Sequence, residues 1–170
     1  MRNILLFCVV IASVGLLTGM GFFKDKYVSE DGVKIIVYKQ GKEMPIDPNT
    51  PHFKELQDLC EDFLKSTTTT IRGYITKKDV SEVKQAELAI EIVYSKQREF
   101  KIPFFKSMSK GNHLLIYLTN KYINRETGKP SIQIFFWGPS YYPGYLGPYS
   151  APRDITEIVD ILKLMEIDID

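Results

Sequence analysis

The chain has 170 residues, with 22 lysines and arginines against 21 aspartates and glutamates, so its formal net charge is +1. This length predicts one domain, and lysines scattered among acids exclude the basic face that nucleic-acid binding requires. The histidines, His52 and His113, have no cysteine or carboxylate neighbours at zinc-site spacing, so we expect no metal and no cofactor.

The amino-terminal segment indicates export. Residues 4–23 carry no charge and lack the polar stripe of a soluble helix. About 20 residues suffice for a helix to span a hydrocarbon core, so a transmembrane anchor is one interpretation. Small residues at Gly19 and Gly21 fit a signal-peptidase site, so cleavage near Gly21 is the other. We expect residues 1–23 to be a signal peptide or anchor and residues 24–170 to be one extracytoplasmic domain, held at the cytoplasmic membrane or secreted.

A hairpin and a helix are the first elements predicted after this segment. Residues 33–38 and 43–46 favour two strands around a turn. Thr50 then offers a helix cap, with Pro51 at the first position of a helix whose apolar residues recur from Phe53 to Leu64. The charged residues expected on its solvent side are Lys54, Glu55, Asp58, Glu61 and Asp62. Cys60 falls on the apolar stripe of this helix. It is the only cysteine in residues 24–170, which excludes an intrachain disulfide within that part of the chain.

Short elements and then a meander are predicted next. The β-branched run 67–76 favours a strand, and residues 77–85 favour a short helix. Four antiparallel strands follow, over 88–94, 99–104, 112–122 and 131–137, with a turn at 95–98 between the first two.

The last predicted element is a helix that begins at Pro152. Its apolar face consists of Ile155, Ile158, Val159, Leu162 and Met165. The fold class expected is therefore α+β: a mostly antiparallel sheet, made of the hairpin and the four-stranded meander, packed by two main helices on one face.

Strand alternation divides the meander into two faces. The expected core face gathers Leu88, Ile90, Ile92, Tyr94, Leu114, Ile116, Leu118, Ile132, Ile134 and Phe136. The second face gathers Glu91, Val93, His113, Leu115, Tyr117, Phe135 and Trp137. The second face is too apolar for simple exposure, so either another part of the fold covers it or it is a partner surface.

Aromatic residues gather between Trp137 and Tyr149, where prolines and glycines exclude a helix interior. Such rings suit sugars or extended peptides. The candidate binding surface is Tyr117, Phe135, Trp137, Tyr141, Tyr142, Tyr145 and Tyr149. In the other interpretation, the rings fold back on the sheet as a lid.

Acid–base chemistry has four candidates, Glu91, Glu99, His113 and Glu126. The sequence alone brings no two of them together. Glu91 lies among apolar strand neighbours, where a carboxylate can serve as a general acid. An enzyme that uses Glu91 or His113 is therefore an alternative, but no residue is assigned a catalytic role.

Three segments resemble small uncharacterised exported or membrane-anchored proteins of Gram-positive bacteria. They are Tyr38–Lys42, Pro51–Phe53 and Ala89–Tyr94. The resemblance implies an exported domain and no activity. We expect a non-catalytic binding domain outside the cytoplasmic membrane, whose partner is a cell-wall glycan, a peptide or a membrane protein. A cell-envelope hydrolase and a structural or assembly protein are the alternatives.

Overall fold

The structure is a computed structural model that describes residues 26–70, 74–85, 88–103, 108–118, 132–139, 145–146, 148–151, 153 and 155–169. Residues 1–23, expected to form the signal peptide or anchor, lie outside this part. Within the described ranges, no helix has the length and apolar character needed to cross a membrane.

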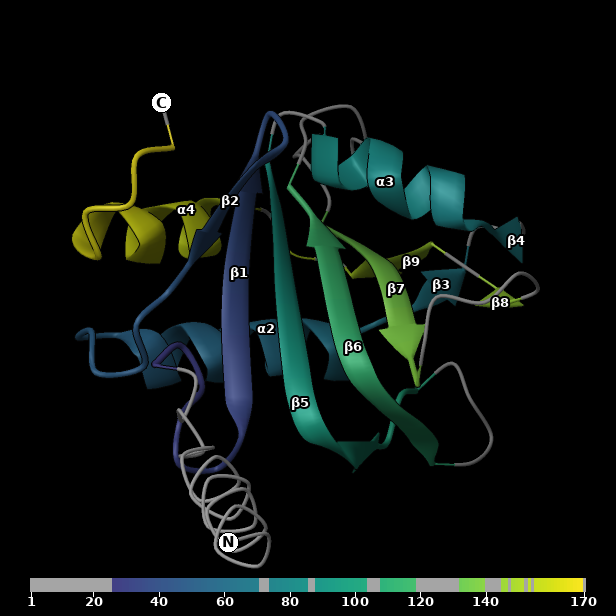
Figure 1. Cartoon of the computed structure of the whole chain (residues 1–170). Coiled ribbons are helices and arrows are strands. Elements are labelled where there is room, and N and C mark those ends of the chain that lie inside the picture. The colour runs from purple at the N-terminus through teal and green to yellow at the C-terminus, as the bar shows by residue number, and fades with distance from the viewer. Residues whose placement is uncertain are drawn as a thin grey trace, which may run out of the picture.

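The described residues form an α+β fold on an antiparallel sheet, which confirms the predicted class (Figure 1). The strand order of the larger sheet is β2-β1-β5-β6-β7-β9-β3. Its longer strands are β1 (Val33–Lys39), β2 (Lys42–Pro45), β5 (Ala89–Phe100), β6 (Ser109–Tyr117) and β7 (Ile132–Gly138), and its short strands are β3 (Thr69–Thr70) and β9 (Tyr149–Ala151). A second sheet pairs β4 (Tyr74–Ile75) with β8 (Tyr145–Leu146).

The predicted hairpin is confirmed as β1 and β2. Lys39 pairs with Lys42, which leaves Gln40 and Gly41 as a two-residue turn. Their φ angles of 49° and 81° are both positive, as the hairpin turn that matches strand twist requires. Glycine at position 41 adopts this conformation without strain.

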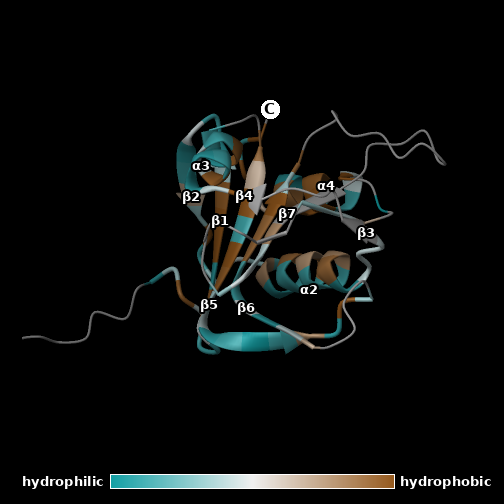
Figure 2. Ribbon diagram, turned by 90° about the vertical axis from the view of Figure 1, so that its right-hand side faces the viewer, coloured by the Kyte–Doolittle hydropathy of each residue, from teal (hydrophilic) through white to brown (hydrophobic). Residues whose placement is uncertain are grey.

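Within the described residues, three helices pack on the sheet: α2 (Phe53–Lys65), α3 (Lys77–Gln85) and α4 (Thr156–Leu164). Helices α2 and α4 lie on one face and α3 lies on the other (Figure 2). The expected starts of α2 and α4 are wrong by a few residues. Helix α2 begins after His52, whose φ of 68° is left-handed and ends the preceding turn, so Thr50 is not its cap.

The apolar residues form two clusters, one on each face of the sheet. The larger cluster joins β1, β5 and β6 to α2 and α4, with Leu56, Phe63, Ile92, Leu114 and Ile158 fully buried. The smaller cluster lies under α3 and consists of Tyr38, Ile75, Val80, Val83, Ala89, Leu115, Tyr117 and Phe136. Part of the second face is therefore covered by the fold itself.

The predicted four-stranded meander is wrong, because the described residues of this region form three strands, β5, β6 and β7. Strand β5 runs without a break from Ala89 to Phe100, through the expected turn at 95–98. Its pairing with β6 shifts register between Val93 and Arg98, an irregularity that bends a strand without ending it. Among the usual turn formers, residues 95–98 contain one serine, Ser95, and no glycine, proline, asparagine or aspartate, so they favour a tight turn only weakly.

A second register shift exchanges the faces of Phe136 and Trp137, which is another correction. Leu115 pairs with Phe136, but the next residue of β6, Ile116, pairs with Ile134, so β7 has one extra residue between the two pairs. One extra residue reverses the alternation of side chains that follow it. Trp137 therefore joins the larger cluster, whereas Phe136 joins the smaller one.

Trp137 packs edge-on against two other rings. Its ring centroid lies 5.2 Å from that of Phe100 and 6.2 Å from that of Tyr94. Its indole nitrogen donates to the Ser109 hydroxyl over 3.1 Å, and only 4% of the residue is exposed. Both the apolar body and the polar tip of the side chain are thus satisfied inside the protein.

We expect Trp137→Ala to lower the free energy of unfolding by about 3–5 kcal/mol, the usual cost of removing a large buried aromatic side chain. Leu164→Ala is the control, because Leu164 is 65% exposed and its truncation should change stability by less than about 0.5 kcal/mol. Urea denaturation measures both. A loss below about 1 kcal/mol for Trp137→Ala would contradict the burial of this ring.

Candidate functional site

Glu91 places a carboxylate in the middle of the sheet face that α3 covers. It lies on β5, between its cross-strand partners Ile36 on β1 and Leu115 on β6. The residue is only 2% exposed. A buried carboxylate is costly unless it is paired and hydrogen-bonded, so its partners decide what it can do.

Three side chains from three different elements surround this carboxylate. The Tyr38 hydroxyl of β1 donates to Oε2 over 2.7 Å, and Nζ of Lys84 on α3 donates to the same oxygen over 2.6 Å. Nδ1 of His113 on β6 lies 3.2 Å from the other oxygen, Oε1. Both oxygens of Glu91 are therefore engaged by the protein.

Tyr38 contributes to this arrangement through both its hydroxyl and its ring. Burial raises the pKa of Tyr38 above its usual range, and the neighbouring Glu91 raises it further, so the hydroxyl stays protonated and can donate. Nζ of Lys84 also lies 4.7 Å from the Tyr38 ring centroid, where the ring face attracts a cation. Lys84 thus joins α3 to both Glu91 and Tyr38. We call Tyr38, Lys84, Glu91 and His113 the Glu91 network.

A groove of about 370 Å³ opens beside this network, between α3 and the β1–β2 hairpin. Helix α3 lines it with Lys77, Val80, Ser81, Lys84 and Gln85, and the hairpin lines it with Tyr38, Gly41 and Glu43. Lys84 and Tyr38 therefore belong to both the network and the groove. Glu91 and His113 do not line the groove.

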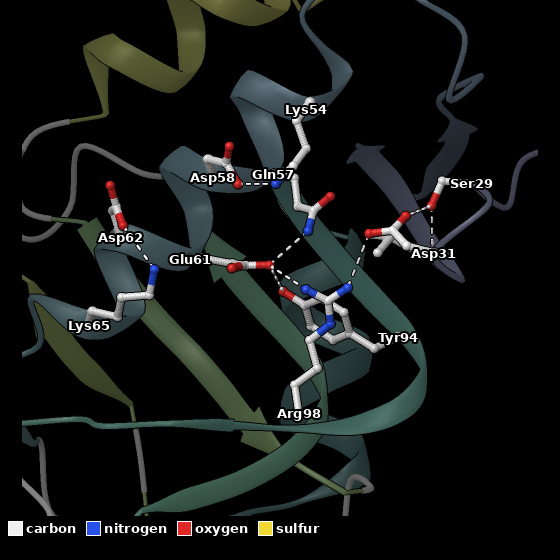
Figure 3. Close-up of polar contacts among 11 residues, drawn as sticks. Ser29, Asp31, Lys54, Gln57, Asp58, Glu61, Asp62, Lys65, Tyr94 and Arg98 are labelled. Atoms are coloured by element: carbon white, nitrogen blue, oxygen red, sulfur yellow. Dashed lines mark hydrogen bonds and ion pairs between the residues drawn. The ribbon is translucent and has the colours of Figure 1, made fainter.

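A second buried carboxylate, Glu61, lies on the opposite face of the sheet (Figure 3). Its Oε1 accepts from Gln57 Nε2 at 2.8 Å, from the Tyr94 hydroxyl at 3.1 Å and from Arg98 Nη1 at 3.3 Å. Arg98 also reaches Asp31, at 3.2 Å. These contacts tie α2 to the bent part of β5 and to the turn before β1.

The burial of Glu61 corrects the sequence prediction, which placed it on the solvent side of its helix. Arg98 extends from the continuous strand β5 and covers it, and the guanidinium also lies 4.6 Å from the Tyr94 ring centroid. The predicted turn at 95–98 places Arg98 in a loop, so the sequence analysis does not anticipate its contact with Glu61. The donors saturate one carboxylate oxygen and indicate a structural crosslink.

The structure describes the side chains of three members of the predicted aromatic binding surface. These three side chains do not form a shared surface. Tyr117 is buried under α3, whereas Trp137 and Tyr149 are buried on the other face. Burial raises the pKa of Tyr149 to about 12. The partner-surface interpretation is therefore wrong for these three: Tyr117 lies in the smaller cluster under α3, and Trp137 and Tyr149 pack in the larger one. Tyr141 and Tyr142, and the side chains of Phe135 and Tyr145, lie outside the described part of the structure.

Of the four acid–base candidates, the structure joins Glu91 with His113. Glu99 instead pairs with Lys110 at 2.7 Å on the surface, and Glu126 lies outside the described residues. Cys60 is fully buried, and burial raises the pKa of its thiol, so it packs as a small apolar residue. No cluster of three His, Cys, Asp or Glu side chains suited to a metal ion occurs in the ranges described.

Sequence reasoning missed Tyr38 and Lys84 as partners of Glu91. The strand pattern places Tyr38 at the end of the first strand, on the same face as Ile36, the cross-strand partner of Glu91. Lys84 follows the buried residue Val80 by four positions, so helical spacing places it on the inward side of α3. That spacing was the available signal.

Comparisons of this chain with protein-family models, with curated proteins and with solved structures find no match. The function must therefore be inferred from the geometry of the groove and the Glu91 network.

Proposed function

We propose that this chain is an exported, non-catalytic binding domain whose ligand occupies the groove between α3 and the β1–β2 hairpin. The observation that carries the proposal is the groove itself, with charged groups from both walls around a space of about 370 Å³. This volume lies at the lower end of the range for small-ligand sites, about 300–1,000 Å³. A small polar ligand fits such a space.

The Glu91 network supports a binding role over a catalytic one. A general acid or base must come within hydrogen-bond reach of the proton that it transfers. Glu91 is 2% exposed, does not line the groove, and has both oxygens engaged by Tyr38, Lys84 and His113. Its role in the proposal is to hold α3 against the sheet and so to shape the groove wall.

Export is proposed from the amino-terminal sequence. Residues 4–23 are uncharged and apolar, and the first strand, β1, begins after them at Val33. The segment would hold the domain on the outer side of the cytoplasmic membrane, or release it after cleavage near Gly21.

A hydrolase is the second candidate, and one contact favours it. His113 Nδ1 lies 3.2 Å from Glu91 Oε1, and a carboxylate at this position can orient a histidine that acts as a base. The candidate ranks second because the groove lining does not include His113. A substrate bound in the groove would have no contact with the ring.

Filling the groove should abolish ligand binding without unfolding the protein. Ser81 is exposed on the groove wall, so Ser81→Trp is expected to occupy the space, whereas Glu82→Trp places the same side chain on α3 outside the groove lining. Purified proteins are incubated with small molecules from a cell-envelope extract, and the retained compounds are identified by mass spectrometry. The parent and Glu82→Trp should retain the same compounds and Ser81→Trp none of them. Equal retention by Ser81→Trp would rule out the groove.

Localisation should depend on the amino-terminal segment. In a Gram-positive host, the full chain is expected in the membrane fraction or the medium, because residues 4–23 would direct export. A chain that begins at Lys24 should remain in the cytosol. Fractionation with immunoblotting measures both, and cytosolic full-length chain would contradict the proposal.

A further inference from the structure

The α3 wall of the groove has a regular pattern of side chains. Lys77, Val80, Ser81 and Lys84 stand at positions i, i+3, i+4 and i+7, which share one face of a helix. At about 1.5 Å per residue, the two lysines are separated by roughly 10 Å along the axis. The wall thus has a cation at each end, with an apolar side chain and a hydroxyl between them.

The two lysines are not equivalent, because only one has its charge balanced inside the protein. Lys84 is bound to the buried Glu91 carboxylate at 2.6 Å. Lys77 is exposed, and within the described part of the chain it has no ion pair. Lys77 is therefore the cation of this wall that is available to a ligand.

The hairpin wall offers the opposite charge. Glu43 on β2 pairs across the hairpin with Tyr38 and is exposed. Among the residues that the structure describes, Glu43 has no ion pair either. The groove consequently presents one uncompensated cation, Lys77, and one uncompensated carboxylate, Glu43, on facing walls.

We infer that the groove binds a short peptide-like zwitterion, with its carboxylate on Lys77 and its ammonium on Glu43. This inference rests on the proposed function and names the ligand class of that same site. Ser81 and Gln85 supply a hydroxyl and an amide for the peptide group, and Val80 supplies apolar contact. The volume of about 370 Å³ limits the ligand to a few residues.

The same groove is poorly suited to a neutral glycan. Sugar rings bind on exposed aromatic faces. The aromatic residue of the groove, Tyr38, is only 4% exposed, and Lys84 lies over its ring. A ligand with two separated anionic groups also fits poorly, since the charge of Lys84 is already balanced by Glu91.

Isothermal titration calorimetry with the full chain in detergent micelles tests the inference. The probe is the dipeptide Ala-Ala, compared with its N-acetylated, its C-amidated and its doubly capped forms. Each single cap should weaken binding by up to about fivefold, the upper end of the range for one charge pair at a solvent-exposed site. The doubly capped peptide should bind most weakly.

Variants assign each end of the dipeptide to its wall. Lys77→Gln should weaken Ala-Ala by up to about fivefold and remove the difference between the free acid and the amide. Glu43→Gln should likewise remove the effect of acetylation. Lys78→Gln is the matched control, because Lys78 is also exposed on α3 but does not line the groove and pairs with Glu82 at 3.6 Å. Lys78→Gln should bind every peptide as the parent does.

Each contrary outcome has a distinct meaning. Equal binding of the free and doubly capped peptides would overturn the zwitterion and leave the groove as a binding site. No binding of Ala-Ala would also overturn it, and the proposed function would stand if Ser81→Trp still lost the retained envelope compounds. If Ala-Ala does not bind and Ser81→Trp retains the same envelope compounds as the parent, both the inference and the proposed function are overturned.

Discussion

A carboxylate in the middle of an apolar sheet face must be supplied with donors, because burying an unpaired charge costs several kcal/mol. In this protein the carboxylate is Glu91, and its donors come from elements that are separate in the sequence. Tyr38 comes from β1, His113 from β6 and Lys84 from α3. Removing any one of them would leave part of a buried charge unpaired. The contact with Lys84 is a polar link between α3 and the sheet, in addition to the apolar packing of Val80 and Val83.

The position of α3 in turn determines the groove. Five of its residues line one wall, and the tight β1–β2 turn keeps Gly41 and Glu43 on the other. Lys84 therefore has two roles, since its ammonium neutralises Glu91 and its side chain lines the groove. The opposite face of the sheet also has a buried carboxylate with hydrogen-bond donors. There, Arg98 and Tyr94 donate to Glu61 and connect α2 to β5. Buried ionic contacts thus fix elements on both faces of the sheet.

Local patterns in the sequence predicted the elements that depend on local physics. The hairpin, the three helices and the antiparallel sheet follow from alternation, helical spacing and turn residues. The continuity of β5 and the extra residue in β7 could not be predicted, because both depend on how each strand pairs with β6. For the site, Glu91 and His113 were recognised as candidates, but their contact requires the β5–β6 register. The exposed aromatic surface failed at Trp137 for the same reason, since one extra residue turned its ring into the core.

The most direct test is a double-mutant cycle between Lys84 and Glu91, measured by urea denaturation. Lys84→Met keeps the length of the side chain, and Glu91→Gln keeps its shape, so each variant removes mainly the charge. If this pair anchors α3, the two substitutions together should cost less than the sum of their separate costs, with a coupling energy of about 1 kcal/mol or more. A coupling energy below about 0.3 kcal/mol would show that the two residues contribute independently, and would contradict the account in which the buried Glu91 carboxylate holds the groove wall in place.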